Sequence, residues 1–403
     1  MSQTLSEQTI ALVKATVPAL EAHGLDIVNE MYARMFQNAD ICDLFNQSHH
    51  GAAGSQSRAL TGAILAYANN IENLGALAPA VERITQKHVG LQILPEHYPH
   101  VAEALLGAIK TVLGDAASDE ILAAWGEAYW FLANILIARE KRIYQDLETA
   151  DGGWSGWRDF VVDEVIRESS VIHSFILRPV DGGAVIRHKP GQYLTFWFEI
   201  PGHTPVKRNY SVSNAPNGMS YRISVKREPQ GLASGWLHDN VRAGTVLKVA
   251  PPAGEFFLSG HPERPVVLLS GGVGLTPMIS MFETIAEQHP QLGVHYIHGT
   301  HDRKTHAMRE HVRSLTDGRP NFIVQDFHQT PLADEVPGRD YDHAGLITDE
   351  WLLANTPVND ADYYVCGPSP FLRAAVSALS LAGVASDRIH YAFFGPADAL
   401  LAA

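Results

Sequence analysis

Hydrophobic residues follow three different periods in three successive parts of this 403-residue sequence. From residue 1 to about 147 they recur three and four positions apart, as along one face of an α-helix. From about 157 to 260 they alternate in short β-branched and aromatic runs, and from about 261 to 403 strand-like and helix-like runs follow one another. One hydrophobic core rarely serves so long a chain, so we expect three domains, with a linker at 148–156 where glycines interrupt the helical period.

The first part is expected to be entirely helical. Its first helix is predicted to begin with a capping box at Thr4 and Glu7 and to carry one apolar stripe, made by Ile10, Val13, Val17 and Leu20. Further helices are expected at about 25–37, 56–74, 77–90, 96–113 and 119–146, and no segment alternates like a strand.

The other two parts predict two kinds of β-structure. Closely spaced turns such as "KPGQ" and "APNG" separate the strands of the second part, which is typical of an all-β barrel or sandwich. In the third part, strands such as "PVVLLS" (265–270) alternate with helices such as "SPFLRAAVSALSLAG" (369–383). This alternation predicts βαβ units on a largely parallel sheet.

Charge and composition argue against two classes of partner. The sequence has 44 acidic and 30 basic residues, a formal charge of -14 and no basic block, so its surface should repel nucleic acid and anionic membranes. No signal peptide is expected, and the longest apolar runs are too short to span a bilayer, so no membrane anchor is predicted. With only Cys42 and Cys366, far apart, a reducing compartment is favoured, and we expect a cytoplasmic enzyme or carrier.

Two motifs in the second and third parts suggest cofactor binding. In "LLSGGVGLTPM" (268–278), a strand meets a helix through a glycine turn, with Thr276 as the expected cap and Pro277 in the first helical position. Such a turn exposes backbone N–H groups to a pyrophosphate, although an ordinary tight turn explains it equally well. "RNYS" (208–211) offers a cation, a flat ring and a hydroxyl, but alone it is more often an ordinary strand.

The order of the motifs resembles the ferredoxin-NADP reductase superfamily. "PGQY", "RNYS", "GLASGWLH", "PAGEFFL", "GGVGLTP" and "CGP" follow one another between residues 155 and 403. This resemblance implies an antiparallel β-barrel that holds FAD through Tyr193, Arg208, Asn209, Tyr210 and Ser211. It also implies an α/β domain that binds NADH or NADPH through Gly271, Gly272, Val273, Gly274, Leu275, Thr276, Cys366, Gly367, Pro368, Phe393, Phe394, Gly395 and Pro396. Ala392 and Phe393 stand where such reductases often carry an acidic residue or a cysteine beside the flavin.

The helical part resembles a globin, and its fusion to a reductase is similar to the flavohaemoglobin family from end to end. "MYARMF", "DLFNQS", "SQSRAL", "QKHVGLQILPEHY" and "LIARE" carry the resemblance, in family order. It implies haem b, with His88 as the iron ligand and Tyr98 and Glu140 as partners of that histidine. Tyr32 and Gln56 are then the distal hydrogen-bond donors, and Phe45, Leu60 and Lys87 contact the haem.

The family resemblance implies a nitric oxide dioxygenase. NAD(P)H would reduce FAD, FAD would reduce haem one electron at a time, and nitric oxide and dioxygen would become nitrate. Two alternatives remain: a dioxygen or nitric oxide sensor or carrier with an attached reductase, and a broad flavin reductase for peroxides, quinones or ferric chelates. Asp302 beside Arg303 and Lys304 leaves the choice of NADH or NADPH open, and a monomer is expected.

Overall fold

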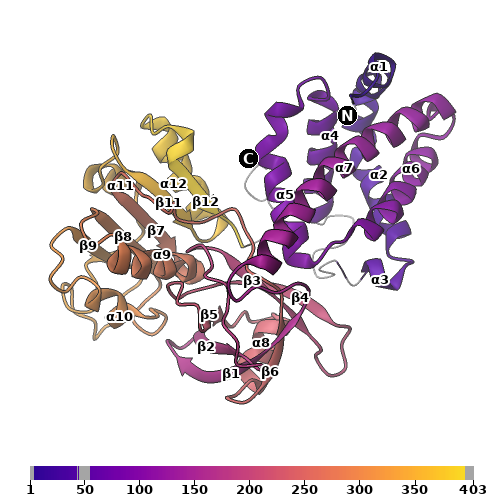
Figure 1. The fold of residues 1–403 in the computed structure, drawn as a ribbon. Helices are drawn as coiled ribbons and strands as arrows, with labels where there is room; N and C mark the ends of the chain where they lie inside the picture. The colour runs from indigo at the N-terminus through magenta and orange to yellow at the C-terminus, as the bar shows by residue number, and fades with distance from the viewer. Residues whose placement is uncertain (1–3, 43, 45–54, 395–403) are drawn as a thin grey trace. The chain divides into compact units, whose positions relative to one another are not determined.

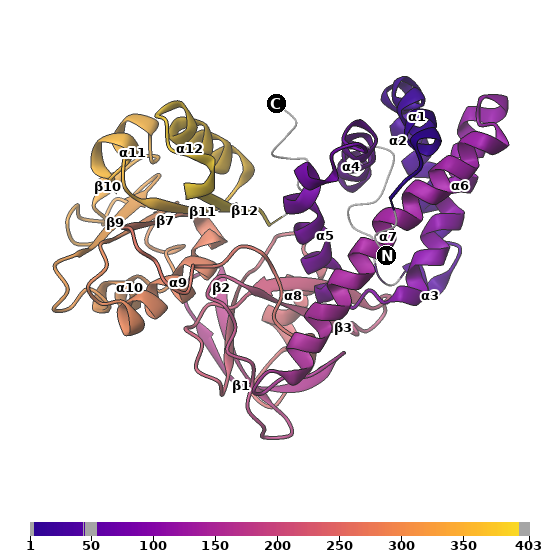
Figure 2. The same ribbon diagram turned by 45° about the horizontal axis from the view of Figure 1, so that its top comes forward.

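The computed structural model describes residues 4–42, 44 and 55–394. The chain forms two compact units that divide between Thr149 and Ala150 (Figures 1 and 2), apart from Pro205–Lys207, which group with the first unit. The first unit is helical, and the second contains two six-stranded sheets (Figure 1). The expected succession of an all-α part, an antiparallel part and a parallel α/β part is therefore confirmed.

The first unit packs its helices around one core. Its described helices are α1 (Glu7–Ala15), α2 (Val17–Met35), α3 (Ala39–Cys42), α4 (Ser55–Asn69), α5 (Ala78–Leu91), α6 (Tyr98–Leu113) and α7 (Asp119–Thr149). Helix α2 packs against α4 and α6, while α7 packs against α1 and α5. The core cluster contains residues of every one of these helices except α5, which contributes partly buried side chains.

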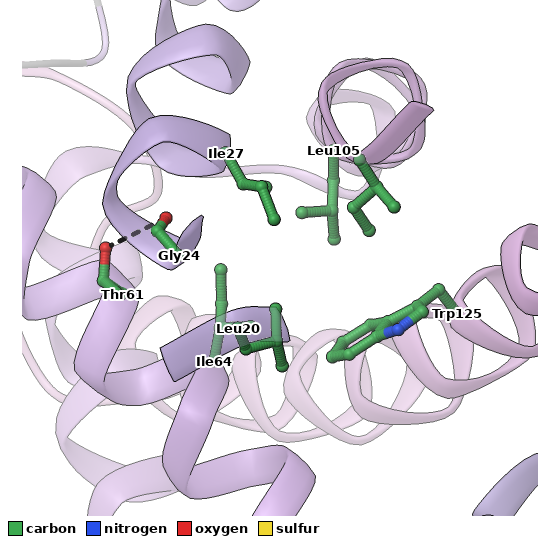
Figure 3. Close-up of a pocket in the computed structure, with 8 residues that line it drawn as sticks. Leu20, Gly24, Ile27, Thr61, Ile64, Leu105 and Trp125 are labelled. Atoms are coloured by element: carbon green, nitrogen blue, oxygen red, sulfur yellow. Dashed lines mark hydrogen bonds between the residues drawn. The ribbon is translucent and has the colours of Figure 1, made fainter. Parts of the chain in front are cut away.

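The beginning of this unit differs from the prediction in three ways. Ser6, not a Thr4 and Glu7 capping box, caps α1, because its hydroxyl accepts the Thr9 N–H at 3.0 Å. The predicted stripe is split between α1 and α2, since Pro18 has no N–H to continue the helical bonding of α1. The helix expected to begin at about residue 25 is instead the continuation of α2, because Gly24 lies inside α2, where a Cβ would meet Thr61 Cγ2 at 2.8 Å (Figure 3).

Helix α7 is longer and more apolar than the sequence interpretation allowed. Within the described residues it is the one helix whose length and composition would suit a membrane span. Its side chains Trp125, Ala128 and Leu136 belong to the core of the first unit. Trp130, on the same helix, is 37% exposed.

The antiparallel sheet of the second unit closes on itself. Its strands are β1 (Arg158–Arg167), β2 (Ile172–Pro179), β3 (Tyr193–Phe198), β4 (Val206–Ser211), β5 (Tyr221–Lys226) and β6 (Val246–Val249), in the order β4-β3-β6-β1-β2-β5. An antiparallel bridge between Val212 and Ile223 joins the two ends of this order, so the sheet is a barrel. Helix α8 (Leu232–Asn240) was not predicted, because the alternation of neighbouring strands suggested an all-β segment.

The parallel sheet has helices on both faces. Its elements are β7 (Val266–Gly271), α9 (Leu275–Gln288), β8 (Val294–Thr300), α10 (Arg309–Ser314), β9 (Phe322–His328), β10 (His343–Ala344), α11 (Asp349–Asn355), β11 (Asp362–Cys366), α12 (Ser369–Leu381) and β12 (Ile389–Ala392). The strand order is β10-β9-β8-β7-β11-β12, and every pairing is parallel. Helices α9 and α10 cover one face, and α11 and α12 cover the other (Figures 1 and 2). The carboxyl ends of all six strands therefore share one edge.

Candidate functional site

Three side chains from three helices meet in the first unit. His88 lies in the last turn of α5, Tyr98 begins α6, and Glu140 lies on the buried face of α7. Nδ1 of His88 is 2.8 Å from Oε1 of Glu140 and 3.1 Å from the Tyr98 hydroxyl, which itself donates to Oε1 at 2.6 Å. Glu140 is 2% exposed, whereas the side chain of His88 is 29% exposed. Only the family resemblance predicted that these three residues meet, and the structure places them in contact.

These contacts determine which nitrogen of His88 is free. Because an ionised carboxylate only accepts hydrogen bonds, the proton of the neutral imidazole must lie on Nδ1. No hydrogen bond from any described residue reaches Nε2, so its lone pair is open. A metal-ligating histidine usually has this arrangement, with its second nitrogen held by a carboxylate.

A haem fits this donor set better than a protein-only metal site does. No group of three or more His, Cys, Asp or Glu side chains among the described residues could hold a metal ion. A porphyrin would supply its own four nitrogens, so one histidine from the chain would be enough to hold its iron. Burial, followed by the hydrogen bond to Glu140, raises the pKa of Tyr98, which therefore remains a protonated donor.

The loop between α5 and α6 is fixed by groups that the sequence did not single out. Gln92 ends α5 in the left-handed conformation, with φ of 60°. The Tyr144 hydroxyl donates to the Ile93 carbonyl at 2.7 Å, and the Tyr129 hydroxyl donates to the Tyr98 carbonyl at 2.7 Å. Both tyrosine donors lie on α7, the helix that also carries the buried carboxylate, so α7 holds both ends of this loop.

The residues expected on the distal side lie on two helices that pack together. Tyr32 is buried on α2 and stacks on Phe36 at 5.4 Å, while Gln56 and Leu60 are half-buried on α4. Lys87 is exposed and adjoins the histidine of α5 in the sequence. Phe45 lies outside the described residues, so its expected contact with haem stays a prediction.

The predicted flavin residues lie on two neighbouring strands of the barrel. Along β4, Arg208 and Tyr210 share one face and Asn209 and Ser211 share the other, because strand side chains alternate. Burial lowers the pKa of Arg208, and an anionic diphosphate would stabilise such a half-buried cation. The Tyr210 ring packs edge-on against Phe196 at 5.7 Å, and Asn209 accepts the hydroxyl of buried Thr195 at 2.9 Å.

Tyr193 begins the adjacent strand β3 and packs against a loop of the same barrel. A Cβ on Gly254, whose φ is +113°, would meet the Tyr193 ring at 3.0 Å. Only a glycine therefore lets this loop lie flat on the ring. The "PAGEFFL" motif that contains Gly254 is thus placed beside the predicted flavin residue Tyr193.

The two segments predicted to bind the nicotinamide dinucleotide are packed backbone to backbone. Strand β11 pairs with β7, with Cys366 opposite Ser270, so both strands end at the same edge. A Cβ on Gly274 would lie 2.1 Å from the Cys366 carbonyl oxygen, and one on Gly367 would lie 3.1 Å from the Gly271 nitrogen. Strand β12 ends beside β11, so Phe393 and Phe394 start from this edge too, while Gly395 and Pro396 lie outside the described residues.

The start of α9 differs from the prediction in its cap. Gly274, not Thr276, is the N-cap, and no side chain caps the helix; the Thr276 hydroxyl instead donates to the Val273 carbonyl at 3.1 Å. Uncapped N–H groups at a helix N-terminus suit a pyrophosphate. The side chains of Leu275 and Cys366 belong to the core, and burial raises the pKa of the Cys366 thiol, so it stays neutral.

A buried carboxylate joins the barrel to the α/β part of the second unit. Glu283 of α9 accepts the backbone N–H of Ala215 at 2.7 Å, Nη2 of Arg222 at 2.6 Å and Nε2 of His311 at 2.7 Å. Burial raises the pKa of Glu283, but these donors outweigh it and the net pKa is lowered. A single acidic residue within the apolar run "MISMFETIA" was the available signal, and the sequence interpretation missed it.

Comparison with known proteins gives the same two kinds of domain. The family model described as Globin matches residues 27–136, and that described as Oxidoreductase NAD-binding domain matches residues 268–377. The chain is 54% identical over 404 residues to the flavohemoprotein of Xylella fastidiosa (strain 9a5c), covering 100% of both proteins. It is 45% identical to the flavohemoprotein of Rhizobium meliloti (strain 1021), covering 97% of this chain and 98% of that one.

Solved structures agree with these matches. The flavohemoglobin from Malassezia yamatoensis, solved with bound FAD and heme, has a TM-score of 0.86 at 26% identity and covers 98% of this chain and 100% of that chain. The FAD/NAD-binding domain of nitric oxide dioxygenase from Vibrio cholerae O1 biovar El Tor has a TM-score of 0.54 at 40% identity. It covers 59% of this chain and 99% of that domain.

Proposed function

The chain belongs to the flavohemoprotein family and is an NAD(P)H-dependent oxidoreductase with haem and FAD, and we propose that its reaction converts nitric oxide and dioxygen to nitrate. The observation that carries this proposal is the contact of His88 Nδ1 with the buried Glu140 carboxylate at 2.8 Å. A carboxylate behind the imidazole makes it a stronger electron donor. A protein that only stores dioxygen gains nothing from such a ligand, whereas one that activates dioxygen does.

The cofactors supply the redox chemistry when bound: FAD divides the hydride of NAD(P)H into single electrons, and haem iron uses these with dioxygen. The residues of this chain would bind and orient these cofactors, and the Tyr98 hydroxyl keeps its proton. His88 would hold the iron, and Tyr98 keeps the Glu140 carboxylate directed at Nδ1. Tyr32 and Gln56 would donate hydrogen bonds on the distal side, with Leu60, Phe45 and Lys87 around the haem.

In the second unit, Arg208 would bind the FAD diphosphate and Tyr193, Asn209, Tyr210 and Ser211 would surround the flavin. Residues 271–276 would bind the dinucleotide through backbone N–H groups at the start of α9. Cys366, Gly367 and Pro368, together with residues 393–396, would line the place of hydride transfer.

The proposal includes the organisation of the whole chain. The haem domain would comprise residues 1–147, the linker 148–156, the FAD domain 157–260 and the NAD(P) domain 261–403. We place the protein in the cytoplasm as a monomer without a membrane anchor, acting on small molecules and not on nucleic acid. The net charge of -14 supports the last point.

Nitrate production coupled to NADH oxidation tests the reaction. One hydride carries the two electrons needed for two turnovers, so the purified holoprotein should form two nitrate ions per NADH when nitric oxide is added in air. His88→Ala should abolish nitric oxide consumption, while His100→Ala, at an exposed position on α6, should leave it unchanged. Steady NADH oxidation without nitrate would favour a broad flavin reductase, and nitric oxide binding without turnover would favour a sensor or carrier.

A further inference from the structure

Three buried polar side chains lie in a row under the carboxyl edge of the parallel sheet. His328 is the last residue of β9, His306 lies in the loop after β8, and Glu335 lies in the loop after β9. The side chains of His328 and Glu335 are 0% exposed, and that of His306 is 4% exposed. The proposed reaction gives none of these three residues a role.

The hydrogen bonds within this row run in one direction. Nδ1 of His328 is 2.5 Å from Oε2 of Glu335, and Nε2 of His328 is 3.0 Å from Nδ1 of His306. Burial raises the pKa of Glu335, but the Arg303 N–H and His328 outweigh it, and the net pKa is lowered. Since the ionised carboxylate only accepts, Nδ1 of His328 donates to it, and Nε2 accepts the proton of His306.

The surroundings of His306 keep its imidazole neutral. Its Nε2 is 3.7 Å from Oδ1 of Asp326, which is paired with Arg309 at 3.0 Å and with Arg313 at 2.7 Å. The ring of His298 lies 5.0 Å from that of His306. Burial, followed by the neighbouring imidazoles and the two arginines, holds the pKa of His306 far below its usual value. The donor and acceptor roles in the row are therefore fixed near neutral pH.

The row joins two loops that leave the sheet side by side, at residues 301–308 and 329–342. Oε1 of Glu335 accepts the backbone N–H of Arg303 at 2.8 Å, so this carboxylate holds the first loop as well as His328 of β9. Backbone hydrogen bonds of 2.8 and 2.9 Å link the first residues of the two loops. We refer to His306, His328 and Glu335 together as the histidine clasp.

The first of these loops ends in a strained residue. Met308 is buried and has φ of 56°, in the left-handed region. Among the described residues, Gln92 is the only other non-glycine residue with positive φ. Such a conformation persists only where the surrounding structure enforces it, and it is typical of ligand-binding segments. His306, two residues earlier, is one of the groups that fix this loop.

Both loops lie where the far half of a bound dinucleotide would extend. The proposed pyrophosphate site is the turn after β7, and the proposed place of hydride transfer lies on the β11 side of that turn. On the other side, β8 and β9 follow β7 in the sheet, at about 4.8 Å per strand. A dinucleotide at the carboxyl edge would therefore place its adenosine half across the ends of β8 and β9.

We propose that the histidine clasp positions the loops after β8 and β9 to bind the adenosine half of the nicotinamide dinucleotide. Its members are positioning residues, because buried side chains act on the ligand only through the loops that they hold. The proposal rests on the proposed position of the dinucleotide and is independent of the reaction with nitric oxide. The clasp should thus affect dinucleotide binding and leave hydride transfer unchanged.

Kinetics with shortened ligands test this role. In His328→Phe a ring remains but both of its hydrogen bonds are lost, so the KM for NADH should rise about tenfold at unchanged kcat. The inhibition constant of 5′-AMP, which represents the adenosine half, should rise by the same factor. The kcat/KM for reduced nicotinamide mononucleotide, which lacks adenosine, should not change. Reduction of ferricyanide by the holoprotein measures all of these quantities.

His295→Phe is the matched control, because His295 is half-buried at the amino end of β8, away from the clasp. It should leave all of these constants unchanged. Glu335→Gln keeps the shape of the side chain but replaces one of its two accepting oxygens by a donor. It should raise the KM for NADH and the inhibition constant of 5′-AMP, and it decides the question if His328→Phe does not fold.

Two results would overturn the proposal. One is a KM for NADH in the clasp variants equal to that of His295→Phe. The other is an equal loss of kcat/KM with NADH and with reduced nicotinamide mononucleotide, because the clasp would then only support the fold. A wild-type protein that reduces ferricyanide with NADH but forms no nitrate would refute the proposed function and leave the role of the clasp standing.

Discussion

Glu140 concentrates its contacts on one oxygen. Oε1 accepts hydrogen bonds from both His88 and Tyr98, while Oε2 is buried and meets no hydrogen-bond donor among the described residues. The negative charge therefore has two neighbours to stabilise it, and both belong to the proposed proximal site. At this scale, the proposed donation of electron density to the iron through His88 would depend on a single carboxylate.

Glu140→Gln keeps the shape of the side chain and removes its charge. Because the imidazole then loses its anionic partner, nitric oxide consumption should fall about 10–100-fold. Reduction of FAD by NADH should be unchanged. A nitric oxide electrode measures the first quantity and stopped-flow absorbance the second. Glu148→Gln, at an exposed position of the same helix, serves as control; equal activities of the two variants would contradict the role of Glu140.

In the second unit, Glu283 resembles Glu140 in being one buried carboxylate on which several hydrogen bonds converge. Glu283→Gln removes the charge that binds Arg222, His311 and the Ala215 N–H, so the free energy of unfolding should fall by about 1–3 kcal/mol. Urea unfolding of the holoprotein followed by flavin fluorescence measures this change. Glu287→Gln lies one turn further along α9 at an exposed position and should have no effect. A normal midpoint for Glu283→Gln would show that the carboxylate does not join the two parts.

At the scale of elements, the turn between β7 and α9 is confined by β11. Gly274→Ala would place a methyl carbon 2.1 Å from the Cys366 carbonyl oxygen, which is backbone and cannot rotate away. We expect a loss of about 1–3 kcal/mol in the free energy of unfolding and a higher KM for NADH. Denaturant titration and steady-state reduction of ferricyanide measure the two effects.

Gly260→Ala is the matched control for Gly274→Ala, because a Cβ on Gly260 would meet no described atom within 4 Å. Its stability and its KM should equal those of the wild type. If Gly274→Ala also behaves like the wild type, the contact between the glycine turn and β11 is not needed for the nucleotide site.

Some elements could be read from the sequence and others could not. Long periodic segments such as α4, α5, α6 and α7 were predicted within about five residues at each end, because their apolar stripes are extended. Elements without such a pattern were missed: α8 follows the turn at Gly231, and β10 has only two residues. The break at Pro18 and the cap at Ser6 depend on local backbone bonding, to which hydrophobic spacing is insensitive.

The residues of the candidate site also differ in how far they could be predicted from the sequence. His88, Tyr98 and Glu140 were grouped by family resemblance, since residues 52 positions apart carry no local signal of contact. Gly274 could be suspected from the glycine turn, but its contact with Cys366 requires the pairing of β7 with β11. Glu283 was marked in the sequence only as a single acidic residue within the apolar run "MISMFETIA", and its three hydrogen-bond partners depend on tertiary packing.

For the whole molecule, buried histidines make stability depend on pH. Burial lowers the pKa of His188 to about 4 and that of His298 to about 3, and it lowers the pKa of His306 far below its usual value. In the unfolded chain these groups regain a pKa near 6.5, so below that pH the unfolded state binds more protons. The contribution of each neutral histidine to the free energy of unfolding is complete above pH 6.5 and is lost as the pH falls toward the pKa of that histidine in the folded protein.

His188 and His298 should therefore each cost about 1.6 kcal/mol of stability between pH 6.5 and pH 5. Urea unfolding of the second unit, followed by flavin fluorescence at both pH values, measures the total. In His188→Gln the difference between the two pH values should be smaller by about 1.6 kcal/mol. The amide can still donate to the Asn214 carbonyl, as Nε2 does at 3.0 Å. An unchanged difference would mean that His188 is not held neutral in the folded protein.

The pairing of β7 with β11 also has a consequence for the synthesis of the chain. Strand β7 can pair with β8 soon after both are made, but its other edge waits for β11, whose residues follow about 90 positions later. Contacts between such distant segments form slowly. On the ribosome the helical unit can thus fold, and could take up haem, well before the electron-donor site exists. Newly made chains would pass through a stage at which they bind gas but cannot yet be reduced by their own nicotinamide site.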